Sequence, residues 1–305
     1  MSTHATQPTP PVSGARAFWN RTDAIRTGYA FILPVLVLFI LFRIWPTING
    51  FLLSFQDYQL TGESTWLGLE HYRYLLEDDL FWHSLRVTMV YTAISVPLTT
   101  CLALGLALLI NQKMRAIGLY RAIYFLPYVT SLVMVGVIWK WVYRNDGGLL
   151  NDLLGTIGLP SVDWLTSSTM VLPSLAIMAT WKGVGYAMMI LLAGLKAIPD
   201  SLHEASAVDG ATGAQTFWKV TLPLLKPVLF FVIVIETIGS FQVFDAIYVM
   251  TGGGPVRASY SLVYLLYDEG FKFQNFGYAS AIGVVLFLIV FSVTMLQRLM
   301  FGRDD

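Results

Sequence analysis

Six long apolar stretches run along the chain, separated by shorter polar segments. They cover residues 28–54, 85–110, 122–143, 169–194, 227–250 and 276–298. Each is long enough for the roughly 20 residues that a membrane-spanning helix requires. None alternates apolar and polar positions as a lipid-facing barrel strand would. The pattern therefore predicts an all-α polytopic membrane protein with six transmembrane helices.

Charged residues are costly inside a bilayer and tend to line a path or form a pair. Arg43, followed by Pro46, lies toward the outer end of the first stretch. Lys182 lies in the fourth stretch and Glu236 in the fifth. Because their signs are opposite, a buried ion pair would offset part of their desolvation cost. The sequence leaves open whether the two meet.

Lys and Arg residues are distributed unequally between the segments that join the six stretches. With the N-terminus inside the cell, cytoplasmic segments hold 11 of them and outer segments hold 6. Cytoplasmic loops carry such an excess, so both termini are expected in the cytoplasm. We expect a mobile N-terminal tail over 1–24 with no signal peptide, a transmembrane domain over 25–300 and a cytoplasmic tail over 301–305.

The composition is that of a chain dissolved in lipid. Hydrophobic residues make up 56% and charged residues 12% of the 305 positions, against about 25% charged residues in a typical soluble domain. The mean hydropathy of +0.64 excludes a disordered chain and argues against an ordinary soluble enzyme. Basic and acidic residues balance at 19 each, so no excess of positive charge favours nucleic acid as a partner.

Motifs for covalent chemistry are missing from the sequence. The single cysteine, Cys101, and four scattered histidines offer neither an internal disulfide nor a metal cluster. The sequence contains no phosphate-binding GxxxxGKS/T run and no HExxH or GxSxG motif. We therefore expect no catalytic residues, no metal and no cofactor in this chain.

The two longer outer segments, 65–84 and 145–169, mix apolar and polar residues. Such a mixture favours short helices packed at the outer rim of the bundle. Their residues have either a structural role or a role in contacting an external partner, and the sequence leaves both interpretations open.

The cytoplasmic loop 195–227 carries the most specific pattern in the chain. Leu202, Ala205 and Val208 recur every three residues, which predicts a short amphipathic helix. Gly210 permits a sharp turn after that helix. Glu204-Ala205-Ser206 is followed after three residues by Gly210 and, nine residues further on, by Val220-Thr221-Leu222-Pro223.

This spacing resembles a pattern that marks the membrane subunits of ABC importers, namely Glu-Ala-Ala, three residues, Gly, nine residues and Ile-x-Leu-Pro. Ser206 replaces the second alanine and Val220 the isoleucine, while the spacing is kept in full. The resemblance extends over about residues 25–300. WLGLEHY (66–72), FDAIYVMTGGGP (244–255) and GYASA (277–281) are similar to the carbohydrate-uptake branch of these importers.

The resemblance implies a type I ABC importer permease fold in a prokaryotic inner or plasma membrane. The implied partners are a second permease subunit, two nucleotide-binding ATPase subunits that bind ATP and Mg, and an extracytoplasmic sugar-binding protein. In this family the short loop helix docks into a cleft on an ATPase, whereas the alternative is a surface helix whose acids are merely solvated. The implied coupling residues are Glu204, Ala205, Ser206, Asp209, Gly210, Leu222 and Pro223.

A second set of residues is expected along the substrate pathway. The resemblance places sugar-contact positions at Tyr128, Lys182, Gly183, Tyr186, Glu236, Ser240 and Val243. Gln242 and Asp245 are added because amides and carboxylates bind sugar hydroxyls. Val243 stands where a polar residue is expected, and Glu236 where a small hydroxyl residue is usual. The alternatives are packing for the two tyrosines, a structural ion pair for Lys182 and Glu236, and helix joining or gating for Gln242 and Asp245.

A neutral disaccharide such as trehalose or a maltose-like sugar is the expected substrate, and glycerol phosphate is the main alternative. An anion favours cations along its path, and Lys182 is the cation placed deep in the spans. A self-sufficient secondary transporter would leave the 204–223 pattern unexplained. That class often shows repeated halves, and no clear repeat is found in this sequence.

Overall fold

The structure is a computed structural model that describes residues 14–59, 63–112 and 116–301. The chain divides into two units, with the boundary between Leu53 and Ser54. Most of both expected tails, residues 1–13 and 302–305, lies outside the described range. The first helix already begins at Gly14, inside the segment expected to be a tail.

The first unit is one long helical segment. Helix α1 (Gly14–Phe39) passes through a π-helical turn, η1 (Ile40–Ile44), into α2 (Trp45–Leu53). Pro46, which has no backbone N–H to donate, follows this turn closely. Leu33, Phe39 and Leu41 are each more than half exposed, so this span needs lipid or another protein around it.

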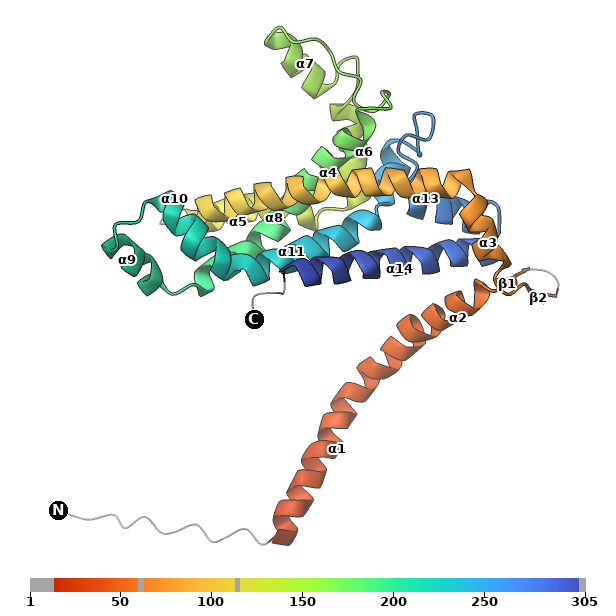
Figure 1. Cartoon of the computed structure of the whole chain (residues 1–305), viewed down its shortest axis with the longest axis horizontal. Coiled ribbons are helices and arrows are strands. Elements are labelled where there is room, and N and C mark those ends of the chain that lie inside the picture. Colours follow the sequence, from red (N-terminus) through yellow and green to blue (C-terminus); the bar gives the residue numbers. More distant parts are fainter. Residues whose placement is uncertain (1–13, 60–62, 113–115, 302–305) are drawn as a thin grey trace. The chain divides into compact units, whose positions relative to one another are not determined.

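The second unit is a helical bundle with a minor antiparallel sheet, in which Gln56 of β1 (Gln56–Asp57) is opposite Trp66 of β2 (Thr65–Trp66). Figure 1 shows α4, α8, α11 and α14 alongside one another, with α9 and α10 near one end and α3 and α13 near the other. The helices are α3 (Glu70–Glu77), α4 (Asp79–Ile110), α5 (Ile117–Val129), α6 (Leu132–Val142), α7 (Leu149–Thr156), α8 (Val171–Ala197), α9 (Asp200–Val208), α10 (Gly213–Thr216), η2 (Phe217–Thr221), α11 (Leu222–Phe241), α12 (Asp245–Met250), α13 (Leu262–Tyr267), η3 (Asp268–Lys272) and α14 (Phe276–Phe301).

The predicted set of membrane spans is confirmed, with one span broken. Within the described ranges, five helical segments are long and apolar enough to cross a membrane. They are Arg26–Leu53, Asp79–Ile110, Val171–Ala197, Gly213–Phe241 and Phe276–Phe301. Helices α5 and α6 together meet the same criterion but are bent by 97° where they join. Counted as one broken span, this pair brings the total to six.

Two predicted spans therefore have the wrong limits. The stretch 122–143 is not one helix, because the backbone is extended at Thr130. The Thr130 hydroxyl donates to the Pro127 carbonyl at 2.6 Å and so satisfies a carbonyl at the end of α5. The stretch 227–250 is also divided, since α11 ends at Phe241 and α12 starts at Asp245. At this second break the Ser261 hydroxyl donates to the Val243 carbonyl at 2.9 Å.

Packing in the second unit is centred on α4 and α8, with α5 against α8 and α11 against both α4 and α14. Buried side chains form two clusters, one that includes Phe81 and Leu175 and another that includes Met188 and Leu225. A hydrogen bond of 2.8 Å joins the hydroxyls of Thr99 on α4 and Thr180 on α8. Such polar links stabilise helix pairs where the surrounding lipid provides no partner.

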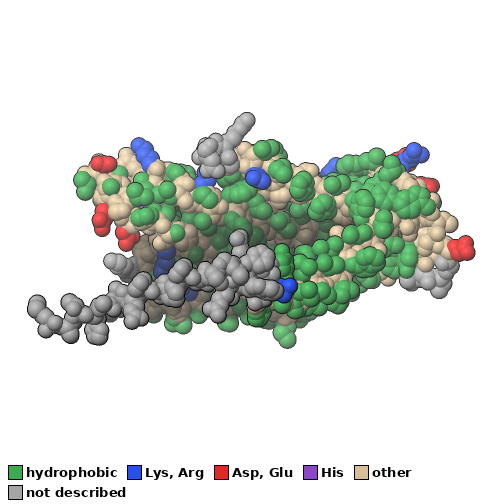
Figure 2. Space-filling model, turned by 90° about the horizontal axis from the view of Figure 1, so that it is seen from below, with side chains coloured by type: hydrophobic (Ala, Val, Ile, Leu, Met, Phe, Trp, Pro, Cys, Tyr) green, Lys and Arg blue, Asp and Glu red, His purple; other side chains and the backbone are tan. Residues whose placement is uncertain are grey.

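The surface is dominated by apolar side chains, as a lipid-embedded chain requires. Figure 2 shows hydrophobic side chains over much of the visible face, with the visible acidic side chains near its two ends. Acidic groups are thus kept away from the middle of this face.

Candidate functional site

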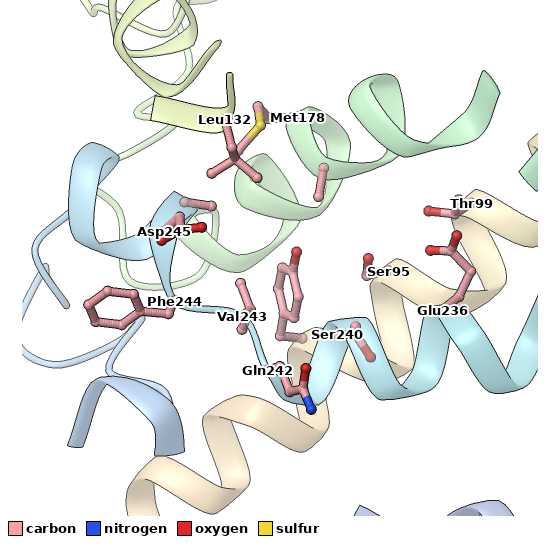
Figure 3. A pocket seen from close by; sticks show the side chains of 14 residues that line it. Ser95, Thr99, Leu132, Met178, Glu236, Ser240, Gln242, Val243, Phe244 and Asp245 are labelled. Carbon is pink, nitrogen blue, oxygen red and sulfur yellow. The ribbon is translucent and has the colours of Figure 1, made fainter. Parts of the chain in front are cut away.

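A pocket of about 310 Å³ opens between α4, α8, α11 and the segment that joins α11 to α12. Its volume is at the lower end of the range for small-molecule sites, about 300–1,000 Å³. Figure 3 shows Glu236 and Thr99 toward one end of the pocket and Asp245 toward the other. The lining comprises Tyr91, Ser95, Thr99, Leu132, Met178, Ala179, Glu236, Gly239, Ser240, Gln242, Val243, Phe244, Asp245 and Ala246.

The pocket lining combines acids, hydroxyls and an amide with apolar surface. Its charged residues, Glu236 and Asp245, are both acidic, and no Lys or Arg is among the lining residues that the structure describes. Ser240 Oγ lies 3.0 Å from Thr92 Oγ1 and 2.9 Å from the Thr237 carbonyl, which fixes its position between α11 and α4. Such a lining accepts hydrogen bonds from hydroxyl groups and offers no cationic side chain to an anion.

Five of the expected pathway residues meet at this pocket, namely Glu236, Ser240, Gln242, Val243 and Asp245. Glu236 and Ser240 share a face of α11, since they are four residues apart. The sequence pattern also places Val243 on that helical face, which is wrong because the helix ends at Phe241. The change of chain direction after the helix, and not helical periodicity, places Val243 in the lining.

Three further polar lining residues lie on α4 and were missed by sequence reasoning. Tyr91, Ser95 and Thr99 are spaced four residues apart, so they share one face of that helix. The signal was present as a polar stripe within the apolar stretch 85–110. The stripe does not by itself indicate a pocket, because hydroxyl side chains in membrane spans also bind backbone carbonyls of their own helix.

The other expected pathway residues form a separate cluster where α5 meets α8. The rings of Tyr128 and Tyr186 are stacked, with their centroids 4.5 Å apart and an interplanar angle of 8°. Lys182 Nζ donates to the Tyr128 carbonyl at 2.9 Å and lies 5.4 Å from the centroid of its ring. That carbonyl is in the last turn of α5, where helix carbonyls lack partners and a cation is favourable.

Lys182 therefore contacts α5, and the structure shows no ion pair between it and Glu236, both of which are described. Gly183 lies beside open space, since a Cβ at this position would meet no atom within 4 Å. Tyr128, Lys182, Gly183 and Tyr186 do not line the pocket. The nine residues expected along the substrate pathway therefore lie in two separate groups. Five of them line the pocket, and the other four form the cluster between α5 and α8.

The predicted loop helix is present as α9, and its end has a well-defined geometry. Gly210 has a φ of +73°, a left-handed conformation that favours glycine. Its N–H donates to the Ala207 carbonyl at 3.1 Å, and the Ala211 N–H donates to the Ser206 carbonyl at 3.0 Å. These two bonds form a Schellman motif, which ends the helix and redirects the chain.

A second helix, α10, is linked to α9 by a side-chain hydrogen bond. Ser206 Oγ and Thr216 Oγ1 are 3.1 Å apart. Thr212 and Gln215 form a capping box at the start of α10. Glu204, Ala205 and Asp209 remain exposed, and so does Pro223 at the start of α11, while Leu222 is half-buried. Val208 is 88% exposed, so acidic and apolar side chains are both exposed on and beside α9.

Residues 99–303 match the model of a protein family described as the binding-protein-dependent transport system inner membrane component. The chain belongs to this family. The permease is therefore a multi-pass protein of the inner membrane, and the resemblance seen in the 204–223 pattern is confirmed.

Relatives match nearly the whole permease. The trehalose/maltose transport system permease protein MalF of Thermococcus litoralis is 36% identical over 88% of this chain and 92% of its own. The sn-glycerol-3-phosphate transport system permease protein UgpA of Brucella abortus is 35% identical over the same shares, 88% and 92%.

Solved structures confirm the predicted permease fold. A bacterial ABC transporter involved in the import of the acidic polysaccharide alginate matches with a TM-score of 0.81 at 23% identity, over 95% of this chain and 99% of that chain. A second structure, of the bacterial alginate ABC transporter in complex with alginate pentasaccharide-bound periplasmic protein, matches with a TM-score of 0.80 at 24% identity, over 92% and 96%.

Proposed function

We propose that the permease forms one half of the translocation pathway of an ATP-driven sugar importer and that the sugar crosses at the pocket between α4, α8 and α11. The observation that carries this proposal is the pocket itself, which brings Glu236, Ser95 and Thr99 together within the membrane-spanning bundle. Their oxygen atoms can bind sugar hydroxyls. The apolar remainder of the lining suits the carbon-bound faces of a sugar ring.

The substrate we propose is a neutral disaccharide of the trehalose or maltose kind. MalF of Thermococcus litoralis is named for these sugars, and the acidic lining supports a neutral substrate. Glycerol 3-phosphate, for which UgpA is named, would bring its phosphate toward Glu236 and Asp245. The described lining holds no Lys or Arg that would balance the phosphate charge, and Lys182 is engaged elsewhere.

The proposed partners are a second permease, two ATPase subunits that bind ATP and Mg, and an extracytoplasmic sugar-binding protein. Within the transmembrane domain 25–300, the loop 195–227 couples the permease to an ATPase through α9, and residues 1–24 and 301–305 are cytoplasmic tails. The exposed Glu204 and Asp209 on or beside α9 suit basic or polar groups of an ATPase cleft. ATP is hydrolysed in the ATPase subunits. This chain forms part of the substrate pathway and transmits their movement to the membrane spans.

Substitution of Glu236 tests this function. In proteoliposomes that contain the complete importer and internal ATP, Glu236→Gln is expected to lower maltose or trehalose uptake about tenfold, the effect of losing one hydrogen bond to a charged group. Assembly with the partner subunits should be retained. The matched control is Glu70→Gln, which changes an exposed carboxylate at the start of α3 and should leave uptake unchanged.

Two results would contradict the proposal. One is unchanged sugar uptake in the Glu236→Gln variant, which would show that this carboxylate does not take part in transport. The other is uptake by the permease alone, driven by an ion gradient without ATPase subunits, which would make it a secondary transporter.

A further inference from the structure

A cluster of aromatic side chains borders the pocket on the segment between α11 and α14. Phe244, Tyr248, Tyr264, Tyr267 and Phe271 form this outer aromatic cluster, from the end of the α11–α12 joint through α12, α13 and η3. The topology inferred from Lys and Arg places this segment on the outer side of the membrane. We propose that the cluster is an entry subsite for a sugar ring, a proposal that rests on the proposed function.

The cluster is continuous with the pocket. Phe244 belongs to the pocket lining, and in Figure 3 its ring points away from Glu236. The Phe244 centroid lies 5.4 Å from that of Tyr248 and 4.9 Å from that of Tyr267. Tyr267 in turn stacks on Phe271 at 5.5 Å with an interplanar angle of 27°. Successive ring contacts thus lead from the pocket to the surface.

The outermost rings are open to a ligand and are not needed to hold their helices. Tyr248 is 48% and Phe271 is 70% exposed. Packing of α12 and α13 is provided instead by Ile247, Leu262 and Leu265, which are fully buried. The exposed rings therefore add little to the packing of α12 and α13 and are accessible to a ligand.

Charged side chains lie beside the aromatic cluster and could bind the hydroxyl groups of a sugar. Lys272 Nζ lies 5.3 Å from the centroid of Tyr264 and 5.8 Å from that of Tyr267. It pairs with Asp268 Oδ1 at 2.6 Å, and Tyr260 donates to Asp268 Oδ2 at 2.6 Å. The hydrogen bond to Asp268 raises the pKa of Lys272, so the ammonium group stays charged at neutral pH and below.

This combination matches the chemistry of a pyranose ring. Its carbon-bound hydrogens form an apolar face that packs on an aromatic ring, and its hydroxyls lie around the edge, within reach of charged and phenolic groups. A pocket of about 310 Å³ holds a small ligand. The cluster would receive a sugar released outside and hold it at the pocket mouth, which limits escape away from the membrane.

The experiment measures maltose transported per ATP hydrolysed by the complete importer in proteoliposomes, with sugar-binding protein saturated with maltose. Tyr248→Ala and Phe271→Ala are expected to lower this ratio roughly three- to tenfold, the range of one aromatic contact. ATP hydrolysis and subunit co-purification should stay at the unmodified level. Phe273→Ala, at a neighbouring residue that is 62% exposed and lies outside the cluster, should leave the ratio unchanged.

The possible outcomes separate the two proposals. An unchanged ratio in both alanine variants, or a fall in ATP hydrolysis that matches the fall in uptake, overturns the entry subsite. If Glu236→Gln still impairs uptake in that case, the proposed function stands. If the unmodified importer transports neither maltose nor trehalose, both proposals are overturned.

Discussion

Asn151 shows how one buried amide organises the outer segment between α6 and α8. Its Oδ1 accepts from the Val162 N–H and from Trp164 Nε1, each at 3.0 Å. Its Nδ2 donates to the Val162 carbonyl at 3.1 Å. The side chain of Asn151 is only 7% exposed, so these bonds have little competition from water. The segment is thereby ordered although α7 is its one helix in the described chain.

Asn151→Ala should loosen this segment. The substitution leaves the Val162 N–H and the Trp164 indole N–H without their acceptor, at a cost of about 1–3 kcal/mol for a buried polar group. We expect faster amide hydrogen exchange across residues 145–169, with spans α4 and α8 unchanged. Asp152→Asn alters the neighbouring, exposed position and serves as the control. Equal exchange in the two variants would show that Asn151 does not organise the segment.

At the scale of elements, the contact between α5 and α8 depends on a single glycine. A Cβ at Gly185 would overlap the carbonyl oxygen of Tyr124, so only glycine allows the two backbones to approach this closely. This close approach also allows the ring of Tyr128 to stack on that of Tyr186. It places the Tyr128 carbonyl within hydrogen-bond distance of Lys182. Gly183 lies two residues away on α8 but faces open space.

The two glycines give a matched pair of substitutions. Gly185→Ala should force α5 away from α8 and destabilise the permease by about 1–3 kcal/mol, as overpacking does. Gly183→Ala should leave stability unchanged or raise it by up to about 1 kcal/mol, because its methyl group would meet nothing and alanine favours the helix more than glycine does. Thermal unfolding of the purified permease in detergent measures both effects. A Gly185→Ala variant as stable as Gly183→Ala would mean that the helices do not pack this closely.

At the scale of the whole molecule, α8 and α11 both border the loop 195–227 and also contribute residues to the pocket. Helix α8 ends at Ala197 and carries the lining residue Met178, while a continuous helical segment runs from Gly213 to Phe241 and carries Glu236. Leu222 and Glu236 are separated by roughly 20 Å of helix, at about 1.5 Å per residue. Under the proposed function, a displacement of the loop would reach the pocket through these helices.

Gly210→Pro should uncouple the loop from transport. Proline fixes φ near −65° and is incompatible with the φ of +73° at Gly210, so the Schellman turn after α9 cannot form. We expect weaker co-purification of the ATPase subunits and a loss of uptake of at least tenfold, the factor that corresponds to about 1.4 kcal/mol.

The control is the same substitution at Gly213, the first residue of α10, where proline is well tolerated and Thr212 before it is already extended. Gly213→Pro should retain both activities. Normal ATPase binding and uptake in Gly210→Pro would exclude a coupling role for this turn.

The number of spans, their orientation and the family pattern at 204–223 follow from the sequence alone. These features are local, because a run of apolar residues, the Lys and Arg content of a loop and a fixed spacing each report on a single segment. The resemblance also brought Glu236 and Ser240 into consideration before their neighbours were known, and the affinity of carboxylates for sugar hydroxyls did the same for Asp245.

Only the tertiary structure decided which of these residues share a site. The break after Phe241, the polar stripe of Tyr91, Ser95 and Thr99, and the contact of Lys182 with Tyr128 depend on helices distant in the sequence. In Ser240 and Thr92, two hydroxyls 148 residues apart meet at 3.0 Å. Side-chain patterns predict which face of a helix is polar, but the pocket exists because packing brings two such faces together.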